Sequence, residues 1–583
     1  MAAIRHIRIE NFRGFDAFET PVRSHAVLVG EPGAGRSDFI EALIRTLDPE
    51  SLRGHRGADL DLYGLDQTHV ASVEVTIGDL PADVKSALFN QLEFWDRQGE
   101  AVVGRLPAGA VPDPERYEYV VRFGYRLAIE DGQPAEVIHY PKFSDPVGGS
   151  FSRVGANERS LIPFLWQRGL STKPIDLAGR GELRDLIDRQ TGEAFADAVD
   201  RFMTSVETAA ADFSSQERVA SALQAVLLPL RSVRRFDDVK TGAELIRFLP
   251  DGGAPSGLLR SLAAAISLLD SPEHFPAVRQ GATLLAALRG GALHAAATTV
   301  GGAIIAVDDF GGEVDPFLAR HLAGELRRSA GQLIVATHSP SVATSFATEE
   351  IIRLHRTGGT RQVGRGPRPA SRKDRISARY LTSTLVEAFN ASAVIVVEGH
   401  HDRLGYVALA ERAIASGRLR SLDGAGITLV EAEGDGESPK VARAARELGI
   451  FSIVLLDNDT GSSAATDPTV QMSLTEADAV VRLPARMALE DILVDGVSEA
   501  ELVRVFTELA QAFGDLALPP GWDQLTGPAL RRVLIRTLHD RPGSLHASFV
   551  WELNDDELPT GAIAALDRLR SIATSRQSGL VEL

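Results

Sequence analysis

The fold of the C-terminal part of the chain is decided by AVIVVEGHHD at positions 393–402 and IVLLDND at positions 453–459. Each begins with an uninterrupted apolar run, Ala393–Val397 and Ile453–Leu456, as expected for a parallel strand that is buried on both faces. Strand-like and helix-like segments alternate on either side of these runs. This alternation predicts a parallel α/β domain over 381–583.

Acidic residues follow both apolar runs. Glu398 and Asp402 come after the first run, and Asp457 and Asp459 come after the second. A helix starting after Gly399 would let the first two point into one space, and open α/β sheets bind ligands at these strand ends. Clustered carboxylates repel one another, and Mg²⁺ or Mn²⁺ converts that cost into favourable coordination. The spacing therefore predicts a divalent metal site, with ordinary loop acids of an acidic protein as the alternative.

A second group of candidate residues lies near the N-terminus. GEPGAGRS at positions 30–37 follows the apolar run Ala26–Val29 and has the spacing of a phosphate-binding loop, with arginine in place of the usual lysine. In such a loop, glycines let backbone N–H groups turn towards phosphates, and a serine hydroxyl holds Mg²⁺. A glycine-rich turn without a ligand is the alternative. The candidate nucleotide-binding residues of the loop are Gly30, Gly33, Gly35, Arg36 and Ser37.

Three other segments fit the same nucleotide site. IIAVDD ends a buried run with two carboxylates, of which Asp308 is expected to act on Mg²⁺ and Asp309 to take the place of a water-polarising glutamate. LIVATHSP places His338 where a γ-phosphate sensor would lie, and Ser256 and Gly257 open a helix upstream. Taken one at a time, these residues have structural alternatives: a strand-end cap, a turn residue and a helix N-cap.

In this order, the segments resemble the ABC-type ATPase head of structural-maintenance and RecF-like proteins, and the opening IRHIRIENFRGF resembles the first strand of that family. The resemblance spans roughly 1–355 and implies ATP binding. Two departures affect turnover. Arg36 cannot place a compact ammonium between β and γ phosphates, and Asp309 is one methylene shorter than glutamate. The sequence therefore predicts that ATP binds and is hydrolysed slowly.

The C-terminal acids resemble those of the Toprim fold. An ABC head followed by a Toprim domain resembles the OLD (overcoming lysogenization defect) nucleases, which include the nuclease subunit of the Gabija defence system. LPARMALEDIL places Glu490 where that family has a further metal-binding acid, and Arg541 aligns with its catalytic lysine, with a surface arginine as the alternative. The resemblance implies an ATP-regulated DNA endonuclease with a two-metal site, in anti-phage defence or DNA processing. It also implies homodimers or larger assemblies and leaves a helicase partner open.

The ATPase part is expected to be interrupted. Residues 1–160 and 236–355 form its two parts, and helical spacing in 161–235 predicts an inserted helical subdomain that mediates dimerisation. Ile4–Ile9 alternates with period two and is expected to be a strand of the first unit, which contains the phosphate loop. Val73–Ile77 and Tyr117–Ile129 also alternate and predict an antiparallel sheet beside that unit.

Residues 356–380 are rich in Gly, Pro and Arg and predict a linker to the Toprim domain at 381–583. Its basic residues could contact the phosphates of DNA, and a solvated tether is the alternative. These residues are Arg361, Arg365, Arg368, Arg372, Lys373 and Arg375.

Composition limits the classes of function. The chain has 583 residues and a formal net charge of −18, so any DNA contact has to be local or pass through metal ions. It contains no cysteine, which excludes disulfides, thiolate metal sites and cysteine nucleophiles. No apolar stretch reaches the roughly 18 residues of a membrane span and no secretory signal is evident, so a cytoplasmic location is expected. Two other functions stay open: a non-catalytic, nucleotide-gated DNA-binding or scaffold protein, and a Toprim ribonuclease.

Overall fold

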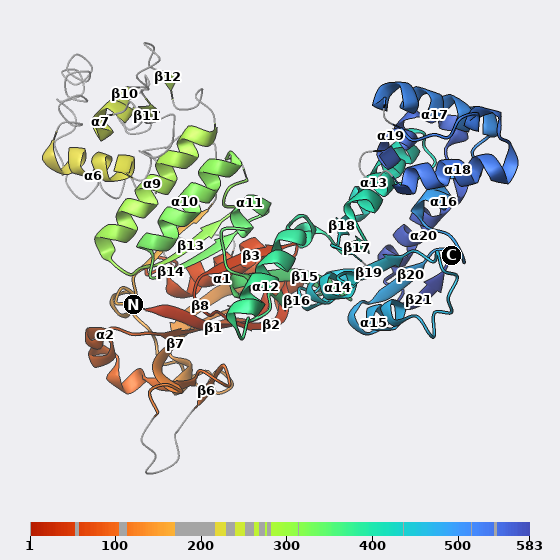
Figure 1. Ribbon diagram of the computed structural model, residues 1–583. Helices are drawn as coiled ribbons and strands as arrows, with labels where there is room; N and C mark the ends of the chain where they lie inside the picture. The colour runs from red at the N-terminus through yellow and green to blue at the C-terminus, as the bar shows by residue number, and fades with distance from the viewer. Residues whose placement is uncertain are drawn as a thin grey trace. The chain divides into compact units, whose positions relative to one another are not determined.

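The computed structural model describes residues 2–52, 58–103, 113–168, 216–228, 240–250, 262–266, 275–276, 282–312, 314–434, 436–514, 516–540 and 545–583. The chain forms two compact units, both of mixed α/β structure (Figure 1). The N-terminal unit comprises Met1–Val29, Gly33–Ile351 and Thr357–Arg361. The C-terminal unit comprises Gly30–Pro32, Ile352–Arg356 and Gln362–Leu583.

The first sheet of the N-terminal unit is antiparallel, with the strand order β2-β1-β4-β7-β5-β6 and β8 paired to β7. Its apolar side chains alternate, so that Ile7 and Ile9 of β1 and Val73 and Val75 of β4 are fully buried. The antiparallel sheet predicted from Val73–Ile77 and Tyr117–Ile129 is confirmed, and the structure adds the strand that contains Ile4–Ile9 to it. The strands are β1 (Ala3–Phe12), β2 (Phe15–Pro21), β4 (Ala71–Gly78), β5 (Glu93–Asp96), β6 (Ala101–Val103), β7 (Tyr117–Glu130) and β8 (Gln133–His139).

A second sheet in this unit contains parallel strands in the order β3-β14-β13-β9. The phosphate loop joins the C-terminal end of β3 to α1, and α9 packs beside α10 (Figure 1). An antiparallel sheet beside a parallel sheet with this loop is the architecture of an ABC/RecF-like ATPase head, as predicted. The elements are β3 (Ala26–Gly30), β9 (Phe164–Arg168), β13 (Ile304–Asp308), β14 (Gln332–Ala336), α1 (Arg36–Leu47), α9 (Ala282–Val300) and α10 (Pro316–Ser329).

The predicted inserted subdomain at 161–235 lies largely outside the described residues, which omit 169–215 and 229–239. Within it the structure describes the strand β9 and the helix α6 (Glu217–Leu227). The candidate residues Ser256 and Gly257 also lie outside the described part of the chain, as does Arg541.

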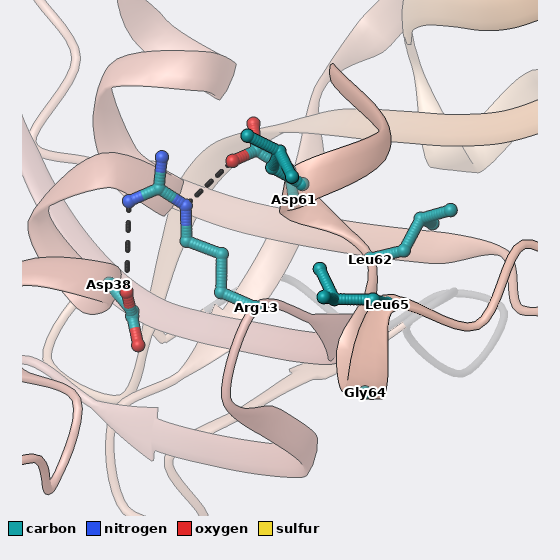
Figure 2. Close-up of a pocket in the computed structure, with 7 residues that line it drawn as sticks. Arg13, Asp38, Asp61, Leu62, Gly64 and Leu65 are labelled. Carbon is teal, nitrogen blue, oxygen red and sulfur yellow. Dashed lines mark hydrogen bonds and ion pairs between the residues drawn. The ribbon is translucent and has the colours of Figure 1, made fainter. Parts of the chain in front are cut away.

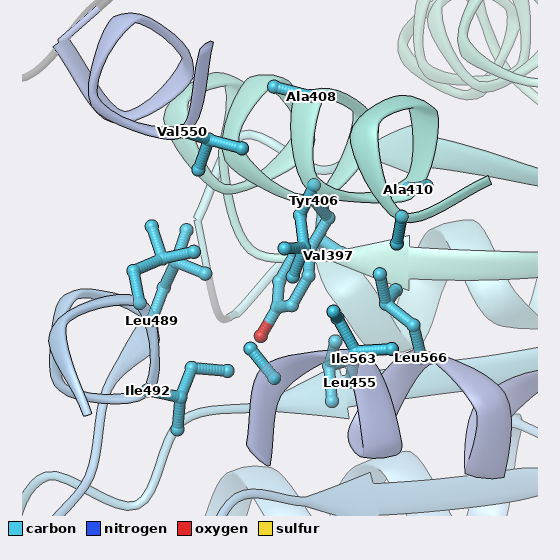
Figure 3. Packing of buried hydrophobic residues seen from close by; sticks show 14 of the residues in the cluster. Val397, Tyr406, Ala408, Ala410, Leu455, Leu489, Ile492, Val550, Ile563 and Leu566 are labelled. Atoms are coloured by element: carbon cyan, nitrogen blue, oxygen red, sulfur yellow. The ribbon is translucent and has the colours of Figure 1, made fainter. Parts of the chain in front are cut away.

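The C-terminal unit is built on a parallel sheet of order β18-β17-β19-β20-β21. The apolar runs that predicted β17 and β19 are fully buried, and the predicted helix after Gly399 is α13. Figure 3 shows part of the core, in which side chains from β17, α13, α16 and α20 meet. The elements are β17 (Ala393–Val397), β18 (Ile427–Glu431), β19 (Phe451–Leu456), β20 (Ala479–Arg482), β21 (Gly579–Glu582), α13 (His400–Ala415), α14 (Ser438–Glu447), α15 (Pro468–Glu476), α16 (Leu489–Val494), α17 (Glu499–Phe513), α18 (Gly527–Asp540), α19 (Leu545–Glu552) and α20 (Thr560–Ser575).

The predicted linker at 356–380 is instead largely structured. The strand β15 (Ile351–Thr357) pairs with β16 (Thr360–Arg365), and α12 (Arg372–Thr384) follows. The prediction is wrong here because glycine and arginine suggested a solvated tether, whereas the Gly358-Gly359 pair forms the turn of a hairpin, with φ angles of 59° and 91°.

Arg353 of β15 fastens this segment inside the C-terminal unit. Its side chain is completely buried, and its Nε donates to the carbonyl oxygen of Phe389 at 3.0 Å. The terminal nitrogens donate to the carbonyl oxygens of Ala391, Leu448 and Gly449. Burial lowers the pKa of Arg353 to about 10, so the guanidinium is still charged at neutral pH. A buried charge is tolerated when its donors are satisfied in this way.

Every helix in the described part of the chain is too short or too polar to cross a lipid bilayer.

Candidate functional site

The phosphate loop has the backbone conformation that its glycines suggest. Gly30 has a φ of 138° and Gly35 a φ of 103°, values that strain any residue with a side chain. A Cβ atom on Gly30 would also lie 1.9 Å from the carbonyl oxygen of Leu354, so the close approach requires glycine. Gly33 has a φ of 74°, and α1 begins directly after Gly35. The turn of the chain therefore presents the start of α1 to a ligand.

Ser37 and Asp308 meet at this loop. The Ser37 hydroxyl donates to Asp308 Oδ1 at 3.0 Å, and the backbone N–H of Asp309 donates to the same oxygen at 2.9 Å. Burial raises the pKa of Asp308 above its usual value, although both hydrogen bonds oppose the shift. A hydroxyl and a carboxylate side by side are ligands that Mg²⁺ uses in nucleotide sites. The residues present therefore fit a nucleotide-bound Mg²⁺.

Asp309 does not stand as an isolated carboxylate. Its backbone is left-handed, with a φ of 46°, and its Oδ1 lies 3.0 Å from Nδ1 of His338. Arg36 lies near both acids, and their charges act to raise the pKa of its guanidinium. Burial has the larger and opposite effect, so the pKa is lowered overall. The structure thus brings together the predicted residues Arg36, Ser37, Asp308, Asp309 and His338.

Arg361 is a residue of this site that the sequence did not identify. Its guanidinium forms an ion pair with Asp38 at 2.7 Å, donates to the carbonyl oxygen of Gly33 at 3.2 Å, and lies 4.9 Å from the centre of the Phe15 ring. Cβ atoms on Gly14 and Gly35 would lie 1.9 Å and 2.9 Å from its Cζ, so two glycines leave the space for it. The side chain is only 12% exposed, and the DNA-contacting role predicted for it as a linker residue is not supported.

A pocket of about 400 Å³ lies beside the first turn of α1 (Figure 2). Arg13 enters it and is held by Asp61, with 2.7 Å between Nε and Oδ1, and by Asp38, with 3.6 Å between Nη1 and Oδ1. The lining residues are Arg13, Asp38, Leu60, Asp61, Leu62, Gly64 and Leu65. Asp38 lies in both the pocket and the first turn of α1, so the two features are continuous.

The C-terminal unit brings four acids to one place. Glu398 follows β17 and Asp457 follows β19, and the backbone N–H of Asp457 lies 3.4 Å from Glu398 Oε1. Asp402 lies in the first turn of α13, where its Oδ2 accepts from the backbone N–H of Gly399 at 2.9 Å. Glu490 lies in the first turn of α16. These acids are the carboxylates that the sequence placed at strand ends, together with the one that the resemblance suggested.

The electrostatics of these acids show their proximity. Burial, followed by repulsion from Glu398, Asp402 and Glu490, raises the pKa of Asp457 to about 8. Burial and repulsion from Glu490 also raise the pKa of Asp402. Among the described residues, no group of three or more such side chains is spaced as a finished metal shell. Ionisation of Asp457 and Asp402 is therefore disfavoured by burial and by their acidic neighbours, and a divalent cation would relieve that cost.

Asp459 differs from these four acids. It is exposed, and its Oδ1 accepts a hydrogen bond from the backbone N–H of its neighbour Thr460 at 2.7 Å. The sequence predicted it as a metal ligand together with Asp457, but the structure leaves its side chain in solvent.

Two further side chains belong to the cluster. His546 of α19 is buried, and its Nε2 lies 3.0 Å from Glu490 Oε1. Burial alone would raise the pKa of Glu490, but this hydrogen bond, together with a backbone hydrogen bond and the neighbouring His546 and His539, lowers it. Tyr406 of α13 is buried in the core of Figure 3, and burial with the nearby Asp457 raises the pKa of its hydroxyl well above the usual value. Tyr406 follows Asp402 by four residues, a signal that the helical periodicity offered. No sequence signal linked His546 to Glu490.

A comparison with family models finds a match within the C-terminal unit. Residues 389–459 match the model described as the overcoming lysogenization defect protein-like TOPRIM domain. This segment contains Glu398, Asp402, Asp457 and Asp459, and the resemblance stated for it is confirmed. No curated protein matches the sequence.

Solved structures resemble the chain distantly. A structure titled as the SmcHead bound to the C-winged helix domain of ScpA has 14% identity and a TM-score of 0.34, covering 62% of this chain and 96% of that one. An Smc head domain bound to the C-terminal domain of ScpA, derived from Pyrococcus furiosus, has 13% identity and a TM-score of 0.34 over the same shares. The recombination mediator protein RecF has 12% identity and a TM-score of 0.32, covering 62% and 98%. The head assignment rests on the two sheets and the phosphate loop.

Proposed function

We propose that this chain, in which an ATPase-head fold precedes an OLD-like Toprim domain, is a metal-dependent DNA endonuclease regulated by ATP binding. The observation that supports it most is the acid cluster after β17 and β19, where mutual repulsion and burial raise the pKa of Asp457 to about 8. A cluster this unfavourable by itself is what a divalent-cation site requires.

The acids and two other residues would have different tasks in phosphodiester hydrolysis. Glu398, Asp402, Asp457 and Glu490 would hold Mg²⁺ or Mn²⁺, and the exposed Asp459 would join them only by turning inward. When bound, the cations lower the pKa of a water and stabilise the leaving 3′ oxygen. Tyr406, which is buried near Asp457, would keep water away from that side of the carboxylates. Arg541 would neutralise charge on the phosphate.

The N-terminal site would bind ATP. Backbone N–H groups at Gly30, Gly33 and Gly35 would face its phosphates, Ser37 and Asp308 would hold Mg²⁺, and His338 would face the γ-phosphate. Ser256 and Gly257 would contact ATP from a second segment. The pocket beside Asp38 offers leucine side chains to a base and charged groups to a ribose.

Slow hydrolysis follows from two residues. Arg36 replaces the lysine, and Asp309 replaces the glutamate and is engaged with His338 at 3.0 Å. ATP would therefore act mainly by binding, and a ligand that binds two conformations of the head differently is sufficient for regulation.

The substrate and partners are part of the proposal. Toprim chemistry does not use a 2′-hydroxyl, so the proposed reaction does not distinguish DNA from RNA. DNA is preferred on the resemblance alone. Self-association through 161–235, a helicase partner, and a role in defence or DNA processing complete it.

A cleavage assay tests the proposal. The full chain is incubated with supercoiled plasmid and, separately, with RNA, in Mg²⁺, Mn²⁺ or EDTA. We expect nicked and linear plasmid with either metal and intact plasmid with EDTA. No cleavage of plasmid in either metal by a protein that melts cooperatively would refute the proposal, and cleavage of RNA alone would replace DNA by RNA.

A non-catalytic scaffold is the second candidate, favoured by the replacements at Arg36 and Asp309 and by the pairing of Asp309 with His338. It predicts nucleotide-dependent DNA binding without strand breaks, which a gel-shift experiment beside the cleavage assay distinguishes.

A further inference from the structure

His546 is a buried histidine next to the acid cluster. Its side chain is only 2% exposed, and its Nε2 lies 3.0 Å from Oε1 of Glu490. Because a carboxylate oxygen only accepts, Nε2–H is the donor, and Nδ1 is buried without a hydrogen-bond partner in the described structure. The histidine therefore makes its one polar contact with a carboxylate that we assign to the metal site.

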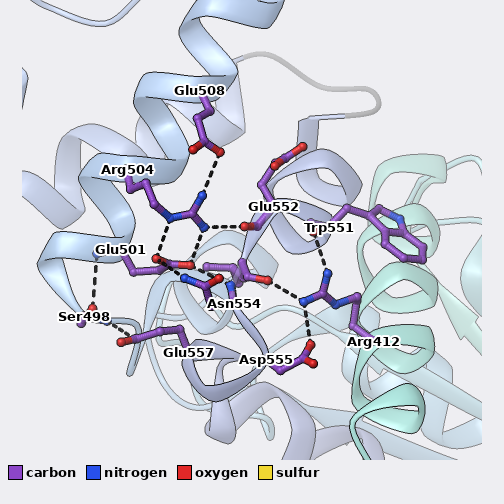
Figure 4. A network of polar contacts seen from close by, with 11 residues as sticks. Arg412, Ser498, Glu501, Arg504, Glu508, Trp551, Glu552, Asn554, Asp555 and Glu557 are labelled. Carbon is purple, nitrogen blue, oxygen red and sulfur yellow. Dashed lines mark hydrogen bonds and ion pairs between the residues drawn. The ribbon is translucent and has the colours of Figure 1, made fainter.

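The helix that contains His546 is fixed at its C-terminal end. Arg412 of α13 donates to the carbonyl oxygen of Trp551 at 2.8 Å, and Arg504 of α17 donates to that of Glu552 at 2.6 Å (Figure 4). Arg504 is itself held by Glu501, with 2.6 Å between Nη2 and Oε1. The last carbonyl groups of a helix lack intrahelical donors. These two arginines donate hydrogen bonds to two of those carbonyl groups in α19 and so hold the end of the helix in place.

The helix α13, which contains Asp402, packs closely against His546. A Cβ atom on Gly405 of α13 would lie 3.3 Å from Cβ of His546 and 3.0 Å from Cδ2 of Leu489, so glycine permits the close approach. The ring of His401, next to Asp402, stacks on the ring of His546 with 6.4 Å between centroids. His546 thus lies against the helices that contain Asp402 and Glu490.

We propose that His546 is a positioning residue: by donating Nε2–H to one oxygen of Glu490, it directs the other oxygen to the divalent cation. Carboxylates that bind metals are commonly oriented by an outer hydrogen bond, and loss of such a partner typically costs 10–100-fold in metal affinity. The inference rests on the proposed metal site. It adds a residue from α19, outside the 389–459 segment that matches the Toprim family.

Metal binding provides the test. Mn²⁺ binding to the full, metal-free chain is measured by isothermal titration calorimetry for the wild type, His546→Phe, His546→Ala and His546→Gln. Phenylalanine keeps a ring without the donor, and glutamine keeps an N–H donor without the ring. His69→Ala is the matched control, because that histidine belongs to the N-terminal unit and is partly exposed. Circular dichroism and thermal melting verify folding.

We expect H546F and H546A to weaken Mn²⁺ binding by about 10–100-fold, H546Q to recover most of the affinity, and H69A to change nothing. Unchanged binding in a folded H546F or H546A would overturn the inference while leaving the proposed function intact. Binding by H546Q as weak as that of H546F would also overturn it, because packing alone would then explain the effect. Should H546A not fold, H546F and H546Q decide. A wild type that binds no Mn²⁺ refutes the proposed metal site itself, and the inference with it.

Discussion

The phosphate-loop site and the acid cluster are both built from carboxylates at strand ends, yet their acids are balanced differently. At the loop, Asp308 accepts from Ser37 and from a backbone N–H, and Asp309 pairs with His338. In the cluster, Asp457 and Asp402 repel their acidic neighbours, and both have raised pKa values. The first site satisfies its charges with residues of the chain, whereas a bound cation would relieve the repulsion around Asp457 and Asp402 in the second.

This difference separates how each site should respond to change. Removing one residue from the loop leaves other partners in place, so binding should outlast turnover. Removing one acid from the cluster would remove a proposed metal ligand. The cluster should also respond to pH and to metal removal.

The largest effect is expected at the cluster. Asp457→Ala or Glu398→Ala should lower plasmid cleavage by more than the roughly 10–100-fold typical of losing an outer hydrogen-bond partner, because each removes a direct ligand. Folding should persist, since both residues follow strands and lie outside the buried runs. Cleavage rates at saturating metal, with Glu447→Ala on the exposed face of α14 as control, measure this. Wild-type rates in either variant would contradict the metal assignment.

Asp459→Ala sharpens that result. If the exposed position of Asp459 persists in the active protein, its loss should affect cleavage far less than the loss of Asp457. An equal loss would mean that Asp459 turns inward when metal binds.

A smaller effect is expected at the phosphate loop. Arg36→Lys with Asp309→Glu should raise ATPase turnover by about tenfold or more, because the pair restores the compact ammonium and the longer carboxylate. In the wild type, a non-hydrolysable ATP analogue should change DNA cleavage as much as ATP does. Phosphate release and plasmid cleavage are the measurements. Fast wild-type turnover, or an inert analogue beside an effective ATP, would contradict this view of the site.

Metal removal should make stability depend on pH. The pKa of Asp457 is about 8 when folded and near 3.8 when unfolded, so the folded chain holds the extra proton between these values. The contribution of protonated Asp457 to the free energy of unfolding is complete below about pH 4. This contribution is lost as the pH rises to about 8, by at most about 1.4 kcal/mol per pH unit. The melting temperature in EDTA should fall as the pH rises over this range. Asp457→Asn should flatten the dependence of the melting temperature on pH. A flat wild-type curve would contradict the shift.

The smallest effect concerns Arg361. Gly14→Ala should displace its guanidinium from Asp38 and Phe15 and destabilise the fold by about 1–3 kcal/mol, as Arg361→Ala should. Both changes remove the same contacts, so their effects on the free energy of unfolding should not add. The double variant should be no less stable than the less stable of the two single variants. Urea unfolding of the three variants measures the coupling, and additive losses would show that Gly14 and Arg361 act separately.

The sequence predicted well those residues whose position follows from local periodicity. Buried runs located β17 and β19, and the helix start after Gly399 gave Asp402 its direction. The same reasoning could not orient Asp459, because two residues past a strand the chain can turn either way. It also could not pair His546 with Glu490, since 56 residues separate them and only the packing of α19 joins them.

Composition misled at 356–380. A segment of glycine, proline and arginine resembles a solvated tether, and no local pattern shows that Arg361 has an acceptor at Asp38 or that Arg353 has four carbonyls. Long side chains find such partners through tertiary structure, which a one-dimensional pattern does not contain.

Arg353 has a practical consequence for dividing the protein into fragments. A Toprim fragment starting at residue 381, the boundary that the sequence suggests, would lack the guanidinium that binds four carbonyls of the C-terminal unit. Those carbonyls would be left without their donor, and the fragment should aggregate or melt early. Extending it to Ile351 would restore Arg353 but not Glu31, whose carboxylate lies 3.7 Å from it. A stable fragment therefore needs both segments, and two polypeptides expressed together are a better design than one cut.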